Sequence, residues 1–442
     1  MTNGGRLLLL KRSSNPMIGA MRASRVEATT PPPLDQETLQ RLRRRATRVI
    51  FAGVALGTTG LFAAFSLGPL VADDISGSTE AAGIPAAAGV AGVAVGALFL
   101  SSIMARRGRG AGLEAGYLLG VVGAVLAVLA VEMLSFWLLL AGMLLIGVAH
   151  GGSQLARFAA ADMHAPERRG MVIAWIVWAG TIGALLGPGS LKPLESVARE
   201  LGLNPLGGGF VAGAVLFAAA LVACALGLRP DPRTLAIEDT SFDTSSKMRV
   251  LSMMSLPHAR AALVVLVAAQ VAMLAIMTMT PLHVREGGHG LGSVGLVMSS
   301  HFVGMFGLAP VAGKLVVRFG SSRVMTFGAM LLLGGAATAS FTPGTAGGLL
   351  SFPLLVLGAG WSLCFVAASA LLTSGLSYGE RTRLQGSVDG VVWTASALAS
   401  FGSGPIVAAV GFLGLCLLAA AVLVLTMLWV WSQAGVMEPE SI

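Results

Sequence analysis

The segment RPDPRTLAIEDTSFDTSSKMRVLSMMSLPH, residues 229–258, is the only long polar stretch between the apolar runs of this 442-residue chain. It carries Pro230, Pro232 and several acidic residues, a composition that indicates a linker rather than a membrane-spanning helix. Six apolar runs precede this segment and six follow it. The sequence therefore predicts two halves with six helices each.

The composition of the chain is that of a membrane protein. Hydrophobic residues make up 55% of it and charged residues 11%, whereas soluble domains carry about 25% charged residues. About 20 apolar residues are needed to cross the hydrocarbon core. We therefore predict an all-α, polytopic membrane protein whose twelve transmembrane helices form two pseudo-symmetric six-helix bundles. The expected spans are 48–72, 84–104, 113–131, 135–161, 170–190, 207–228, 259–282, 292–313, 323–341, 346–372, 386–408 and 409–432.

These spans divide the chain into five parts. We expect a disordered basic cytoplasmic tail at residues 1–47 and an N-terminal bundle at 48–228. A cytoplasmic linker at 229–258 leads to a C-terminal bundle at 259–432 and a cytoplasmic tail at 433–442.

The charge distribution predicts the orientation of the chain. When both termini are placed in the cytoplasm, all of the 29 Lys and Arg residues except Lys192, Arg199 and Arg285 lie in inner segments. That distribution follows the positive-inside rule. The expected location is therefore the bacterial inner membrane, with both termini inside.

Several function classes are not expected. The net charge of +8 could suggest nucleic acid, but the basic residues fall between apolar runs and form no separate domain. The three cysteines have no C-x-x-C spacing, and no nucleophile–base set or phosphate loop is visible, so we expect neither an enzyme nor a cofactor. The expected partners are the lipid bilayer and a small-molecule or metal-ion substrate, with the chain acting as a monomer.

The two halves repeat each other in sequence. Trp178 and Trp393 are separated by 215 residues, and the Gly-Pro pairs at 187–188 and 404–405 are separated by 217. A nearly constant offset at several positions is typical of an internal duplication. The repeat predicts a substrate site between the halves, near the midplane of the membrane.

This layout resembles the major facilitator superfamily, or MFS. The resemblance rests on the 6+6 arrangement, the Gly-Pro ends of helices five and eleven, and the basic loops after helices two and eight. It implies transport by alternating access. The family's loop aspartate falls at Ala105 and Val317, so gating by the family's usual Asp–Arg contacts is not expected. The candidate gate residues are Arg106, Arg109, Arg157, Asp162 and Arg318.

Four side chains in helices seven and eight could bind a metal ion. Met273 and Met277 are four residues apart, as are His301 and Met305, so each pair lies on one helix face. The two pairs overlap in depth if the helices are neighbours, which the short loop between them favours. Thioether and imidazole ligands suit Cu(I). Methionine is also an adaptable core filler, so packing remains the alternative interpretation.

The pattern M-x-x-x-M followed by H-x-x-x-M resembles the signature of the CcoA-like copper transporter (CalT) family within the MFS. The resemblance implies import of copper for cytochrome oxidase assembly, with copper as cargo and Met273, Met277, His301 and Met305 as its ligands. The same family includes RfnT-like proteins proposed to take up riboflavin.

Two other substrate classes therefore remain open. Riboflavin or another organic nutrient would stack on Trp175, Trp178, Trp361 or Trp393. It would also hydrogen-bond to His150 and Gln154 on helix four. The 181–189 end of helix five resembles an antiporter motif, which would suit proton-coupled efflux of small molecules.

Overall fold

The computed structural model describes residues 35–237, 257–372 and 378–432. The chain divides into two units at Leu42, and the candidate functional site lies in the second unit, residues 43–442. The described residues form helices, and no β-strand occurs among them.

The N-terminal half contains six long helices and one short helix. These are α2 (Gln36–Ser76), α3 (Ile84–Arg107), α4 (Arg109–Glu132), α5 (Phe136–Ala161), α6 (Pro166–Gly189), the short α7 (Leu191–Glu200) and α8 (Gly208–Gly227). The turn η1 (Thr79–Gly83) precedes α3, and the turns η2 (Pro205–Gly207) and η3 (Pro232–Leu235) flank α8.

The C-terminal half repeats this plan with two interruptions. Its elements are α10 (Pro257–Glu286), α11 (Leu291–Phe302), the π-helical turn η4 (Val303–Gly307), α12 (Ala309–Phe319), α13 (Ser321–Phe341), η5 (Gly344–Leu350), α14 (Ser351–Leu372) and α15 (Tyr378–Ser432). Together α11, η4 and α12 form one span, and α15 is divided by a kink at Gly411, where φ is 71°.

Eleven helical stretches of the described residues are long and apolar enough to cross a membrane. The kink at Gly411 lets the last of these cross twice, which gives twelve spans. The predicted fold class is confirmed: this is an all-α membrane protein built from two six-helix bundles.

Close helix packing explains the abundance of glycine. In the N-terminal half, α3 and α4 both pack on α5. A Cβ atom added at Gly147 of α5 would lie 1.9 Å from the carbonyl oxygen of Gly89 in α3, so only glycine allows the two backbones to meet. In the C-terminal half, α10 packs chiefly against α15 and α14.

One boundary differs from the expected ones. The first helix begins at Gln36, within the tail expected to be disordered up to residue 47, because the charged segment before the apolar run also favours helix. The first residues of the linker are ordered as well. The Asp231 side chain accepts hydrogen bonds from the backbone N–H groups of Arg109 and Gly110. The rest of both segments, residues 1–34 and 238–256, lies outside the described residues.

Candidate functional site

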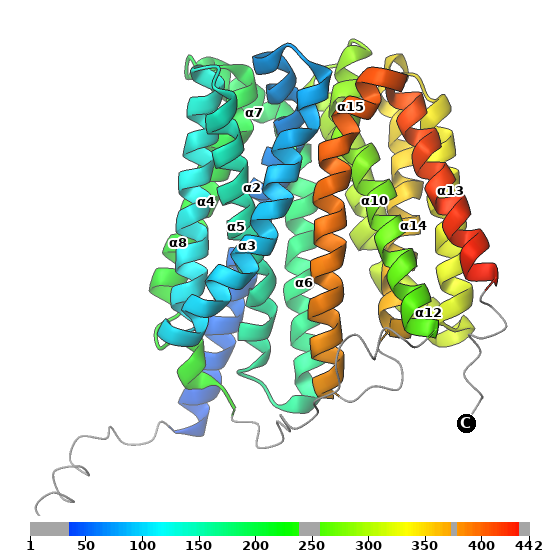
Figure 1. The fold of residues 1–442 in the computed structure, drawn as a ribbon. Helices are drawn as coiled ribbons and strands as arrows, with labels where there is room; N and C mark the ends of the chain where they lie inside the picture. Colours follow the sequence, from blue (N-terminus) through cyan, green and yellow to red (C-terminus); the bar gives the residue numbers. More distant parts are fainter. Residues whose placement is uncertain (1–34, 238–256, 373–377, 433–442) are drawn as a thin grey trace, which may run out of the picture. The chain divides into compact units, whose positions relative to one another are not determined.

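The two halves are in backbone contact at one end of the bundle. We call this end, which carries α7, the α7 end, and the opposite end, near η3, the linker end (Figure 1). A Cβ atom at Gly83 would lie 2.0 Å from the Ser400 carbonyl oxygen, and one at Gly295 would lie 2.3 Å from that of Pro188. Each of these contacts joins one half to the other, so the seam is closed at the α7 end.

An ion pair spans the same seam. Arg285, near the end of α10, places Nη2 2.6 Å from Oδ1 of Asp74 in α2. Arg285 Nη1 also donates a hydrogen bond to the Leu70 carbonyl oxygen, at 3.4 Å. Both charged side chains are about one-third exposed, so the pair can separate without leaving an uncompensated buried charge. We call Asp74 and Arg285 the gate pair.

A continuous row of aromatic rings crosses from one half to the other. Its ring centroids are 4.5 Å apart between Phe62 and Phe302, 6.4 Å between Phe302 and Phe306, 6.4 Å between Phe306 and Trp361, and 4.8 Å between Trp361 and Phe365. Phe62 belongs to α2, and the other four belong to the C-terminal half. We call these five residues the aromatic row.

The π-helical turn η4 sets the course of this row. Phe302 ends α11 and Phe306 lies within η4, so the wider turn determines how the two rings follow each other. The rings are nearly parallel, with 25° between their planes. Such turns are rare and are found frequently at functional sites.

The far end of the row is fixed but accessible. Trp361 Nε1 donates a hydrogen bond of 2.7 Å to Oε1 of the buried Gln270 in α10. The Trp361 ring is half-buried, and Phe365 stacked on it is 38% exposed. An oriented, partly open pair of rings can stack on a flat aromatic molecule.

The N-terminal half contributes a second aromatic group at the seam. Trp178 is 51% exposed and lies 6.4 Å from Phe51 and 6.0 Å from Trp175, measured between ring centroids. Seven residues further along α6, the Leu185 carbonyl oxygen accepts a hydrogen bond from Ser299 of the other half. Seven residues are nearly two helical turns, so Trp178 points to the same side as Leu185, roughly 10 Å closer to the linker end.

The other predicted substrate-lining residues are His150, Gln154 and Trp393. His150 and Gln154 meet on one face of α5, with Nε2 of each 3.0 Å apart, and His150 Nδ1 is buried without a hydrogen-bond partner. Trp393 is half-buried in α15. Their contact with a substrate stays a prediction.

His301 is held in one orientation. Its side chain is fully buried, and Nδ1 lies 2.9 Å from the Leu354 carbonyl oxygen of α14. A carbonyl can only accept, so Nδ1 carries the proton and Nε2 keeps a lone pair. Nε2 is buried and has no hydrogen-bond partner, which is the arrangement that a metal-ligating histidine needs.

The four predicted metal ligands lie on elements that all pack on α14, which runs antiparallel to α10. The bond between Gln270 and Trp361 fixes which face of α10 points at α14. Met273 and Met277 follow Gln270 by three and seven residues, so they lie within about 60° and 20° of that face. Because Met277 is seven residues beyond Gln270 and Leu354 is seven before Trp361, Met277 lies level with Leu354.

His301 and Met305 reach the same stretch of α14 from the other side. His301 bonds to Leu354, and a Cβ atom on Gly358 would lie 3.0 Å from the Met305 backbone nitrogen. All three methionines of the set are buried. The sequence-based reasoning expected helices seven and eight to be neighbours, but α14 packs on both of them and their direct contact is smaller.

The contacts seen for the predicted gate residues lie within the N-terminal half or near their own helix. Arg109 Nη2 and Asp162 Oδ2 form an ion pair of 2.7 Å at the linker end. The guanidinium of Arg157 lies over the Phe158 ring, and that of Arg318 over the Phe319 ring. Arg106 is exposed. Among the described residues, none of these contacts joins the two halves.

Sequence reasoning named Trp361 as a possible stacking residue, but it missed the gate pair, the other four members of the aromatic row and the role of Asp231. Asp231 bonds to the loop after α3, where the expected loop aspartate is replaced by Ala105. Arg285 did carry a signal, because it is one of three basic residues outside the predicted inner segments.

Comparison with known sequences identifies relatives along most of the chain. The model of the Major Facilitator Superfamily matches residues 49–404. The "Uncharacterized MFS-type transporter YdeG" of Bacillus subtilis is 32% identical over 404 residues, which cover 90% of this chain and 94% of that protein. The "Riboflavin transporter RfnT" of Brucella anthropi is 28% identical over 375 residues, covering 84% and 90%.

Solved structures share the fold. A bacterial homolog of the human lysosomal transporter Spinster, in an inward-facing and unoccupied conformation, superposes with a TM-score of 0.69 at 14% identity, covering 92% of this chain and 98% of that one. A POT family transporter in complex with 5-aminolevulinic acid gives a TM-score of 0.67 at 13% identity, covering 89% and 97%.

Proposed function

This chain belongs to the Major Facilitator Superfamily of membrane transporters, and from that premise we propose that it imports a planar aromatic nutrient of the riboflavin class. The aromatic row is the observation that carries this substrate class. It crosses between the halves and ends in the accessible Trp361–Phe365 pair. The similarity to a riboflavin transporter supports the same class.

The chemistry of such a ligand suits the accessible aromatic rings of both halves and two polar residues of α5. Riboflavin has a flat three-ring system, which stacks favourably on indole and phenyl faces. Trp361 and Phe365 offer such faces in the C-terminal half, and Trp178 offers one in the N-terminal half. His150 and Gln154 supply polar atoms on α5 for the polar edge of the ring system or for its side chain.

We further propose that the linker end is cytoplasmic, as the distribution of basic residues favours. The closed α7 end then faces outward, and this conformation is inward-facing. In the transport cycle the gate pair separates, the substrate reaches the aromatic row from outside, and closure of the gate pair precedes release at the linker end.

Uptake of radiolabelled riboflavin in cells that lack other riboflavin transport tests this function. Replacing Trp361 with alanine is expected to lower the initial uptake rate by about tenfold or more. The variant loses the stacking face and leaves buried Gln270 without its bond. Trp361→Phe keeps an aromatic ring, so its initial uptake rate is expected to lie between those of wild type and Trp361→Ala.

The matched control is Trp137→Ala, which removes an exposed tryptophan at the start of α5, outside the aromatic row. Its uptake rate is expected to stay within about twofold of wild type. Equal uptake in Trp361→Ala and Trp137→Ala, at equal amounts of folded protein, would rule out the aromatic row as the substrate path.

Copper import is a second candidate, favoured by one specific observation. His301 Nε2 is buried with a free lone pair, and the three methionines of the set are buried on elements that pack on α14. Such donors stabilise Cu(I), which here would be cargo rather than a resident metal. The third possibility, proton-coupled efflux, is favoured by no contact among the described residues.

The copper candidate predicts that cells expressing the wild-type chain accumulate radioactive copper under reducing conditions. Accumulation should fall about tenfold or more in His301→Ala, because the imidazole ligand is lost. His164→Ala, which changes a histidine near the linker end of the N-terminal half, is the control and should accumulate copper normally. If cells that express the wild-type chain accumulate no more copper than cells without it, copper import is eliminated. The result of the riboflavin assay would stand independently of that outcome.

A further inference from the structure

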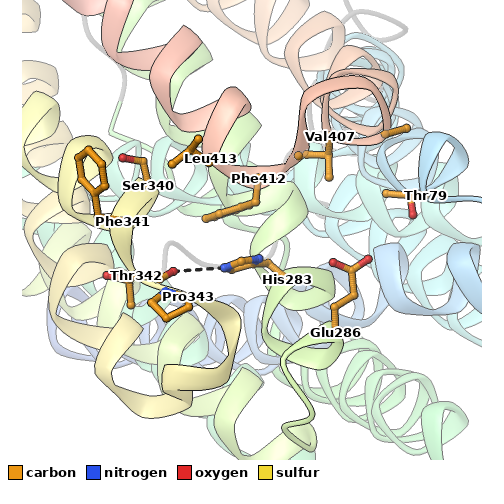
Figure 2. Close-up of a pocket in the computed structure, with 12 residues that line it drawn as sticks. Thr79, His283, Glu286, Ser340, Phe341, Thr342, Pro343, Val407, Phe412 and Leu413 are labelled. Atoms are coloured by element: carbon orange, nitrogen blue, oxygen red, sulfur yellow. Dashed lines mark hydrogen bonds between the residues drawn. The ribbon is translucent and has the colours of Figure 1, made fainter.

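A cavity of about 590 Å³ opens at the α7 end. Figure 2 shows the residues that line it. Its walls come from the end of α10, the turn between α13 and η5, and the two legs of α15 around Gly411. Thr79 of η1 completes it from the other half. The volume is that of a site for a small organic ligand.

The two titratable groups of this cavity, His283 and Glu286, lie on one turn of α10. Glu286 lines the cavity and forms no ion pair with any described residue, since its neighbour Arg285 pairs with Asp74 instead. His283 Nε2 donates a hydrogen bond of 3.3 Å to the Thr342 carbonyl oxygen, so Nδ1 is left as an acceptor. The cavity therefore offers a carboxylate and additional acceptors, and neither Lys nor Arg lines it.

Aromatic rings form the other walls. The His283 ring stacks on Phe412, with 4.1 Å between centroids and 8° between planes. Figure 2 shows the two rings side by side. Phe341, Pro343 and Leu413 add apolar surface. Aromatic faces attract cations as well as flat rings, so the walls and the carboxylate favour the same kind of ligand.

We propose that this cavity is a binding site for a small aromatic ammonium cation. The ammonium group pairs with Glu286, and the ring packs among His283, Phe341 and Phe412. The site is distinct from the proposed transport path, because none of the aromatic-row residues lines it.

The position of the cavity couples it to the gate. Thr79 belongs to the N-terminal half and the other lining residues belong to the C-terminal half, so the cavity is complete only when the α7 end is closed. Arg285 of the gate pair lies between His283 and Glu286 in sequence. A ligand that binds here therefore binds the closed state better than the open state, and it shifts the equilibrium toward the closed α7 end.

Titration of the purified full chain in lipid nanodiscs with tryptamine, followed by calorimetry, tests the site without any transport assay. Saturable binding is expected, with affinity lowered about tenfold or more in Glu286→Gln because the charge-assisted bond is lost. Glu200→Gln, which neutralises an exposed carboxylate on α7, should bind as wild type. Indole-3-propionate, which carries the opposite charge, should not bind.

Two further variants separate the cavity from general charge attraction. Val407→Trp fills the cavity and should abolish binding while the protein remains monodisperse. Arg285→Glu adds a negative charge beside the cavity, which by charge alone would strengthen tryptamine binding. Because this variant opens the seam and moves Thr79 away, we expect weaker binding, by about threefold or more.

Each alternative outcome is decisive. Absence of saturable binding, or equal affinity in wild type and Glu286→Gln, would refute the site. Unchanged or stronger binding in Arg285→Glu would refute the coupling to the gate. Since only binding is measured, these results stand whether or not the chain transports riboflavin.

Discussion

The Arg285→Glu variant is expected to lose substrate uptake by about 100-fold or more. The new carboxylate would face Asp74, where the guanidinium now lies 2.6 Å away. Asp73 and Glu286 are adjacent in sequence to the gate pair. With Asp74 and the new carboxylate at position 285, four carboxylates would therefore lie close together at the seam. Juxtaposed like charges cost several kcal/mol, and each 1.4 kcal/mol is about a factor of ten in the population of the closed gate. Alternating access requires that closure in every cycle.

Uptake of the labelled substrate and the state of the gate are measured separately. Ser400 is fully buried where it meets Gly83, so a cysteine at this position reports opening of the seam. Its labelling by a maleimide in purified protein should be slow in the wild-type background and at least about tenfold faster in Arg285→Glu. The native cysteines are replaced by serine for this experiment.

The charge-swapped double variant Asp74→Arg with Arg285→Glu is the internal test. It restores an attractive pair with reversed polarity, so transport and slow labelling should return in part. The matched control is Arg199→Glu, which reverses a basic residue on α7 that pairs within its own helix. Wild-type uptake in Arg285→Glu would show that the gate pair does not hold the seam.

The second large effect is expected from Gly358→Ala, in which one methyl group should strongly destabilise the folded protein. The added Cβ would lie 2.3 Å from the His301 carbonyl oxygen and 3.0 Å from the Met305 backbone nitrogen. Both obstacles are backbone atoms, so the helices must separate. Overpacking of this kind costs about 1–3 kcal/mol and occasionally more.

Thermal unfolding in detergent, followed as the folded fraction remaining after heating, measures this effect. The apparent Tm of Gly358→Ala should fall by about 5 °C or more, and copper accumulation, if present, should be lost with it. Gly334→Ala in α13 is the control, because a Cβ there meets nothing within 4 Å. Alanine favours helix over glycine, so Gly334→Ala should be neutral or slightly stabilising. Equal Tm values would contradict the tight approach of α14 and α11.

The sequence was sufficient for the fold and the family. Apolar runs of about 20 residues cross a bilayer as helices, because a helix satisfies all of its backbone hydrogen-bonding groups internally. The polar linker divides these runs six and six. The resemblance to the MFS is confirmed by the family match over residues 49–404. Even the last two spans, which run together in sequence, were separated close to the kink at Gly411.

The sequence also determined parts of the candidate site that depend on one helix alone. Residues four apart share a helix face, which placed Met273 with Met277, and His150 with Gln154. The latter pair does meet, at 3.0 Å. Periodicity gives such pairs because a single helix has a fixed geometry.

Only the tertiary structure decided which helices face one another. The gate pair joins residues more than 200 positions apart, and the aromatic row draws on α2, η4 and α14. The placement of α14 against both α10 and α11 brings Gln270 to Trp361 and His301 to Leu354. The physical reason is that apolar side chains satisfy the bilayer and the protein interior equally well, so hydrophobicity alone predicts the spans but not their neighbours. Those neighbours are selected by close backbone packing at glycines and by the few polar bonds between helices.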